Sequence, residues 1–194
     1  MTWLGNGLSS ARLHTDALSV KEAQFSMMKR LGAPEHYLLV TRSNLANTYA
    51  ELGRHEDSLR MSRDVYSGNL RLEGAEAEET LRAANNYAWG LFNLRHFDEA
   101  KALMRKMMPV ARRVFGESDA LALKMRWIYA AALYLDTSAT LGDLRESVEI
   151  LESVANSWKR IFGPAHPETP KAQDALKYAR EALAARLAAS AGSA

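Results

Sequence analysis

The chain has 194 residues, with 25 basic against 23 acidic side chains and no cysteine. The nearly balanced charge argues against a dedicated nucleic-acid-binding protein, and the lack of cysteine excludes disulfides and thiolate metal sites. The longest apolar run, WIYAAALYL, is about half as long as a membrane-spanning helix, and the N-terminus has no secretory signal pattern. We therefore expect a cytoplasmic protein without a membrane span.

Helical segments recur along the chain at a regular interval. The stretch SNLANTYAELGRHEDSLRMSRDVY from Ser43 aligns without a gap with NNYAWGLFNLRHFDEAKALMRKMM from Asn85, at an offset of 42 residues. A third copy begins at Trp127, but its second half is displaced to an offset of 47, and we place the inserted residues in the turn 135–143. Each copy predicts a first helix, a short turn and a longer second helix closed by glycine.

The repeats predict a single array over residues 1–194. Its parts are a partial leading repeat (1–31), three full repeats (32–73, 74–115 and 116–162) and a C-terminal capping helix with a tail (163–194). Pro109 falls inside the second helix of the second repeat and should kink it. Trp3 corresponds to Leu45, so the leading hairpin lacks the beginning of its first helix. We therefore expect residues 1–15 to be irregular or to be covered by another chain.

The spacing of small and aromatic residues resembles the tetratricopeptide pattern L-G-x2-Y…A, in LANTY (45–49) followed by HEDS (55–58). The longer period and the linker GPAHPET (163–169) resemble the kinesin-light-chain variety of that repeat. The third repeat departs from it, with Trp127 where an asparagine is expected. The resemblance implies an all-α, right-handed superhelical solenoid of antiparallel helix hairpins that binds other proteins.

The sequence offers no catalytic motif: it has no phosphate loop, no HExxH and no GxSxG. We therefore expect neither an enzyme nor a metal or cofactor. Met104, Met107 and Met108 are interpreted as core residues, with a soft partner-binding patch as the alternative. Basic residues close every second helix, at Lys29-Arg30, Arg71, Arg112-Arg113 and Lys159-Arg160. These could form a ridge for an anionic partner, but the helix dipole accounts for them equally well.

Asparagine is a poor helix former, yet several asparagines fall in the middle of predicted first helices. If Tyr87, Ala88 and Leu91 form the packing face of the second repeat, these amides are left on the concave face. The predicted groove residues are Asn44, Asn47, Glu51, Arg82, Asn85, Asn86, Trp89, Asn93, Lys124, Trp127 and Tyr134. Amides can bond a peptide backbone, and aromatic rings can take its side chains. The alternative is that these residues are only solvated or are packed within a tight superhelix.

We predict a non-catalytic scaffold that binds an extended peptide or a partner protein in this groove. Arg82 and Lys124 would add a preference for acidic or C-terminal carboxylate ligands, weakened by salt. No nucleic acid is expected among the partners, and no membrane span is expected. The alternative function is self-assembly, or a structural role in a larger complex, through exposed end helices or the convex face. That alternative includes self-association through the N-terminal end.

Overall fold

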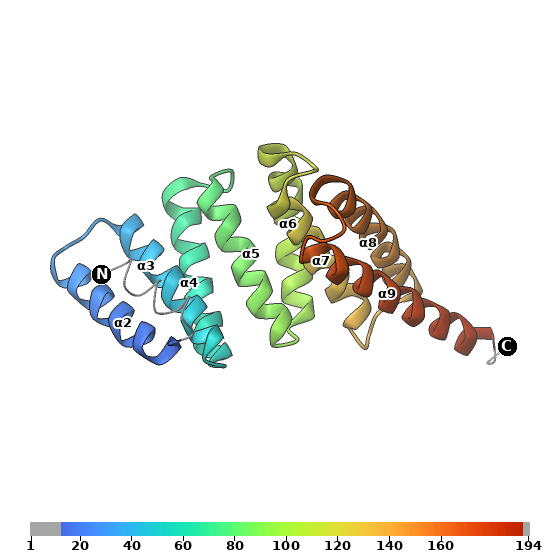
Figure 1. Cartoon of the computed structure of the whole chain (residues 1–194), viewed down its shortest axis with the longest axis horizontal. Helices are drawn as coiled ribbons and strands as arrows, with labels where there is room; N and C mark the ends of the chain where they lie inside the picture. Colours follow the sequence, from blue (N-terminus) through green and yellow to red (C-terminus); the bar gives the residue numbers. More distant parts are fainter. Residues whose placement is uncertain (1–12, 192–194) are drawn as a thin grey trace. The chain divides into compact units, whose positions relative to one another are not determined.

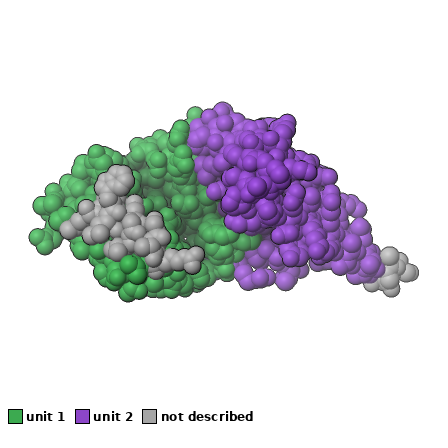
Figure 2. All heavy atoms as spheres, in the orientation of Figure 1, with its two compact units in different colours: residues 1–94 green, residues 95–194 purple. Residues whose placement is uncertain are grey.

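The computed structural model describes residues 13–191, and in this range the chain forms eight helices and no strand (Figure 1). This confirms the predicted all-α class. The chain forms two compact units, residues 1–94 and 95–194, which Figure 2 shows in different colours.

The first unit is built of antiparallel helices that each pack on the next one along the chain. They are α2 (His14–Arg30), α3 (Glu35–Glu51), α4 (His55–Glu73) and α5 (Glu78–Asn93). Most of the segment predicted to be irregular, residues 1–12, lies outside the described residues. For His14 and Thr15, the expectation of irregular structure is wrong, because both residues already belong to α2.

The second unit repeats this arrangement with four further helices. They are α6 (Phe97–Phe115), α7 (Ala120–Leu135), α8 (Leu141–Phe162) and α9 (Glu168–Ala191). The end helix α9 packs on α8 and also contacts α7. Pro109 lies inside α6 without ending it.

The residues inserted in the third repeat divide between a turn and a helix. The turn 136–140 has five residues, where the α3–α4 turn has three, and α8 has 22 residues, where α4 and α6 have 19. The prediction that all of them lie in the turn is therefore only partly right. Thr140 decides where α8 begins. Its hydroxyl accepts a hydrogen bond from the Asp143 N–H, and the Asp143 carboxylate accepts one from the Thr140 N–H, which together form a capping box.

Glycine closes the long second helices, as the sequence predicted. Gly74, Gly116 and Gly163 follow α4, α6 and α8 with φ values of 82°, 88° and 85°. Glycine has no Cβ, so this backbone conformation carries no steric penalty, and the chain can turn sharply into the next hairpin.

Close helix packing in the first unit depends on glycine as well. A Cβ on Gly68 of α4 would lie 2.6 Å from a methyl group of Leu39 on α3. A Cβ on Gly90 of α5 would lie 3.0 Å from a methyl group of Leu59 on α4.

In the second unit, Met104 and Met107 are fully buried, which confirms their core role, while Met108 is only partly buried.

Candidate peptide-binding site

Two small hollows lie in the first unit, each lined by residues of α3, α4 and α5. The first hollow has a volume of about 210 Å³ and is lined by His36, Leu39, Val40, Ser43, Val65, Asn69, Glu73, Glu79, Arg82, Ala83 and Asn86. The second hollow has a volume of about 50 Å³ and is lined by Asn47, Ala50, His55, Ser58, Ser62, Asn86, Trp89, Gly90 and Asn93. Five residues of the predicted groove therefore line these two hollows.

A buried stripe of α4 contributes to both hollows. Ser58, Ser62, Val65 and Asn69 recur at intervals of three or four residues, and all four are buried. The Asn69 side-chain amide donates a hydrogen bond to the backbone carbonyl of Glu79 at 3.3 Å, which links α4 to the start of α5. Three of the four side chains are polar, so the hollows are not purely apolar.

Asn86 is the residue that the two hollows share. It is partly buried, and its side-chain oxygen accepts a hydrogen bond from the Asn85 amide at 3.5 Å. Asn85 itself lines neither hollow. Its side-chain oxygen is buried and has no hydrogen-bond partner among the described residues. Of the two adjacent asparagines that the sequence singled out, only Asn86 therefore lines a hollow.

Trp89 is 45% exposed and lines the second hollow beside Asn47 and Asn93. Its ring stacks on Phe92 at a centroid distance of 5.5 Å. The opposite side of α5 packs as the sequence predicted, because Ala88 and Leu91 are buried.

Tyr87 belongs to the same packing face. Its ring stacks on that of Tyr66 in α4 at a centroid distance of 6.1 Å, and it is partly buried. This supports the division of α5 into a packing face and an open face.

The charges around the first hollow do not favour an acidic ligand. Arg82 pairs with Glu78 at 3.6 Å and shares the hollow with Glu73 and Glu79. The negative charges near Arg82 therefore outnumber its own positive charge. The expected preference for acidic ligands has no support at this position.

Two other predicted groove residues of the first unit, Asn44 and Glu51, line neither hollow. Asn44 is partly buried on α3. Glu51 is exposed, and its carboxylate lies 2.9 Å from the Nδ1 atom of His14. The structure therefore does not bring these two side chains to the hollows.

The predicted groove residues of the third repeat lie on α7, in the second unit. Lys124 is exposed, but Trp127 is partly buried and packs against a cluster that includes Leu123 and Trp158. Tyr134 packs against a neighbouring cluster of α7, α8 and α9, and burial raises the pKa of its phenol. Both aromatic side chains thus contribute to the core of this unit, which fits the alternative of packed rather than groove residues.

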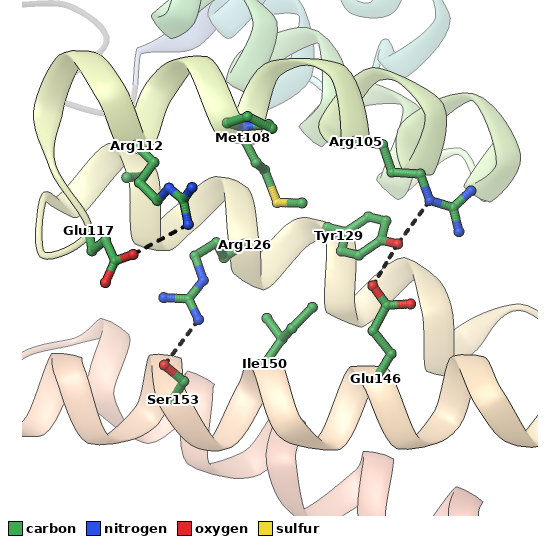
Figure 3. Close-up of a pocket in the computed structure, with 11 residues that line it drawn as sticks. Arg105, Met108, Arg112, Glu117, Arg126, Tyr129, Glu146, Ile150 and Ser153 are labelled. Carbon is green, nitrogen blue, oxygen red and sulfur yellow. Dashed lines mark hydrogen bonds and ion pairs between the residues drawn. The ribbon is translucent and has the colours of Figure 1, made fainter.

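A larger hollow lies in the second unit, where the sequence predicted no site. We call it the arginine pocket (Figure 3); it has a volume of about 510 Å³. It is lined by Arg105, Met108, Pro109, Arg112, Glu117, Ala122, Arg126, Tyr129, Glu146, Ile150 and Ser153. The one signal in the sequence was a proline inside a helix, with arginines four residues before it and three after it.

Within residues 13–191, no helix is long and apolar enough to cross a membrane. The same part of the chain contains no group of three or more histidine, aspartate or glutamate side chains that could hold a metal ion.

Comparison with known proteins identifies the repeat. A family model described as tetratricopeptide repeat matches residues 38–76, 80–120 and 137–168. The first two matches begin 42 residues apart, which is the period read from the sequence. No curated protein matches the chain.

Solved structures share the fold at low sequence identity. A Podosopora anserina protein with nearly identical kinesin light chain TPR-like repeats is 19% identical, with a TM-score of 0.76 over 96% of this chain and 87% of that chain. A substituted form of the same protein has a TM-score of 0.77 over 96% and 86% of the two chains, at 19% identity. BtubC (BKLC) from P. vanneervenii is 15% identical, with a TM-score of 0.63 over 94% and 78%. These similarities confirm an all-α repeat solenoid that resembles kinesin light chain.

Proposed function

Because the chain belongs to the tetratricopeptide repeat family, whose repeats generally mediate protein–protein interaction, we propose that it binds an extended segment of a partner protein between α3 and α5. Repeat proteins of this kind are generally non-catalytic scaffolds, and we propose the same role here. The observation that carries the proposal is the position of Asn86 and Trp89. Asn86 lines both hollows, and Trp89 exposes its indole ring beside the second hollow.

The chemistry of these two side chains suits a peptide. A carboxamide offers both donors and an acceptor, so Asn86 can bond the backbone N–H or C=O of an extended chain, whichever faces it. Trp89 supplies a large, rigid apolar surface next to polar groups, which is typical of residues that dominate binding energy. Asn47 and Asn93 add further amides around the second hollow.

The experiment begins with a selection of peptides from a random library displayed on phage, using the whole chain as bait. The affinity of each selected peptide is then measured by fluorescence anisotropy for the natural chain, Asn86→Ala and Trp89→Ala. We expect each substitution to weaken binding by about 1–3 kcal/mol, because truncation removes a central contact. The fold should be unchanged, as judged by circular dichroism.

A matched control is Asn156→Ala, which removes an exposed amide from α8 in the other unit and should leave the affinity unchanged. Trp89→Phe should retain part of the affinity, because it keeps an aromatic surface. If the selected peptides bind Asn86→Ala and Trp89→Ala as tightly as the natural chain, they bind elsewhere and the proposal is wrong.

The alternative of self-assembly has one observation in its favour. Tyr178 and Leu187, on the end helix α9, are 54% and 42% exposed. Light scattering at several protein concentrations tests it. A monomer at all concentrations would remove self-assembly and leave the peptide-binding proposal intact.

A further inference from the structure

The arginine pocket has two ends with different electrostatic character (Figure 3). At one end, Arg105 donates a hydrogen bond from Nε to the Tyr129 hydroxyl at 2.9 Å, and that hydroxyl donates to Glu146 at 3.0 Å. The guanidinium, the phenol and the carboxylate are therefore linked in one chain of hydrogen bonds. This end needs no ligand.

The other end holds two guanidinium groups and one carboxylate. Arg112 and Glu117 are both exposed and lie 3.5 Å apart, at the outer limit of a hydrogen bond. An exposed pair of this kind contributes little and can rearrange at small cost. Arg112 is therefore available to a ligand that enters the pocket.

Arg126 is the informative residue. It lies on α7, is only partly exposed, and donates a hydrogen bond to the Ser153 hydroxyl on α8 at 3.0 Å. No carboxylate lies within 4.0 Å of its guanidinium in residues 13–191. Burial lowers the pKa of Arg126, and the neighbouring charge of Arg112 lowers it further, while Glu117 opposes both effects. Glu117 already offsets part of the cost of burying Arg126, but it pairs with Arg112 at 3.5 Å, and an anion in direct contact with Arg126 would offset more.

The balance of charge indicates which anion fits. The pocket is lined by three arginines and two glutamates, so the excess is a single positive charge. A carboxylate carries one negative charge, whereas a phosphate monoester carries nearly two and would face repulsion from both glutamates. Between the two ends lie the apolar side chains of Met108 and Ile150 (Figure 3). They can cover an apolar side chain next to the carboxylate.

We propose that the arginine pocket binds the carboxylate of an acidic residue in a partner peptide, between Arg112 and Arg126, while an adjacent apolar side chain packs on Met108 and Ile150. This site is separate from the hollows of the first unit and does not depend on the function proposed for them. Its volume of about 510 Å³ lies within the usual range of ligand pockets.

The test uses three blocked tripeptides: acetyl-Leu-Glu-Leu-amide, its glutamine counterpart and its phosphoserine counterpart. Each is titrated into the ¹⁵N-labelled whole chain while the Nε–H signal of Arg126 and the backbone amides of α7 and α8 are followed. We expect the glutamate peptide to shift these signals saturably and to bind about tenfold or more tightly than the glutamine peptide, because its carboxylate is charged. Added salt should weaken its binding.

Two variants give opposite expectations. Arg126→Gln should weaken binding of the glutamate peptide about tenfold or more, whereas Arg145→Gln, which removes an exposed arginine from α8 outside the pocket, should not change it. Glu117→Gln should strengthen binding, because it frees Arg112 and removes a competing carboxylate. Damage to the fold cannot produce a tighter complex, so this variant separates a binding role from a structural one.

Results of three kinds would overturn the proposal. The first is no saturable shift with the glutamate peptide at millimolar concentration. The second is equal binding of the glutamate and glutamine peptides, or equal binding by the natural chain and Arg126→Gln. The third is tighter binding of the phosphoserine peptide, because it would show that the pocket accepts a doubly charged anion and that the carboxylate assignment is wrong.

Discussion

An ion pair between α6 and the end of α7 predicts a specific dependence of stability on pH. The Lys101 ammonium lies 2.6 Å from the Asp136 carboxylate, and their side chains are 13% and 12% exposed. The hydrogen bond from Lys101, followed by those from the Ser138 hydroxyl and N–H, lowers the pKa of Asp136 from 3.8 to about 2. Burial lowers the pKa of Lys101, but its hydrogen bonds to Asp136 and Asp98 and the charges of these carboxylates outweigh burial, so the pKa is raised overall.

The direction of the pH dependence is set by the Asp136 carboxyl, which binds its proton more weakly in the folded state than in the unfolded state. The folded pKa of Asp136 lies below the unfolded value, so the folded state is favoured wherever the carboxylate is ionised. The stabilisation is complete above about pH 4 and is lost as the pH falls through 2. A shift of nearly two pH units corresponds to about 2 kcal/mol of unfolding free energy at neutral pH, and about half of this should remain at pH 3.

The perturbation is Asp136→Asn, which removes the charge but keeps an oxygen that can accept from the Ser138 N–H. Urea unfolding followed by circular dichroism should show a loss of about 2 kcal/mol at pH 7 and about 1 kcal/mol at pH 3. Asp98→Asn is the matched control. That carboxylate lies 2.8 Å from the same ammonium but is 91% exposed, so its loss should matter little at either pH. If Asp136→Asn costs the same free energy at both pH values, the ion pair is not the cause and the reasoning fails.

Three further predictions concern stability. Leu91→Ala should lower the unfolding free energy by about 2–5 kcal/mol in urea titrations, because Leu91 is buried and the substitution leaves a cavity. Asn93→Ala, on the exposed face of the same helix, should change this free energy by less than about 0.5 kcal/mol. Gly68→Ala should lower the unfolding free energy, because overpacking against Leu39 costs about 1–3 kcal/mol and exceeds the gain of about 1 kcal/mol in helix propensity. The double variant with Leu39→Ala should recover part of this loss. If Gly68→Ala loses no stability, or the double variant recovers none, the prediction is wrong. EDTA should leave the melting temperature unchanged, and a drop of more than a few degrees would reveal a bound metal.

Most of the predictions about helices and buried faces came from the repeat period of the sequence. An offset of 42 residues placed equivalent positions on equivalent helices, and helical periodicity then separated the buried Ala88 and Leu91 from the exposed Trp89. Both steps depend only on local spacing. That is why the helices and the open face of α5 could be predicted, although no ligand was known.

The sequence could not indicate surroundings that come from another part of the chain. Trp127 occupies a position like that of Asn85, but α8 and α9 supply apolar neighbours that cover its ring. Arg126 and Ser153 are far apart in sequence, and nothing in either segment indicates that their side chains meet. The split of the inserted residues was readable in principle, because Thr140 and Asp143 have the spacing of a capping box.

The arrangement of the two hollows limits the geometry of any ligand that enters both. Arg82 lines one hollow and Trp89 the other, and they lie seven residues apart on α5, which corresponds to about 10 Å along a helix. In a β-strand, residues three apart span about that length but point to opposite sides. In a polyproline II segment, residues three apart face the same side at a distance of about 9 Å. A peptide with two anchoring side chains three residues apart, held in that conformation by proline, matches this spacing.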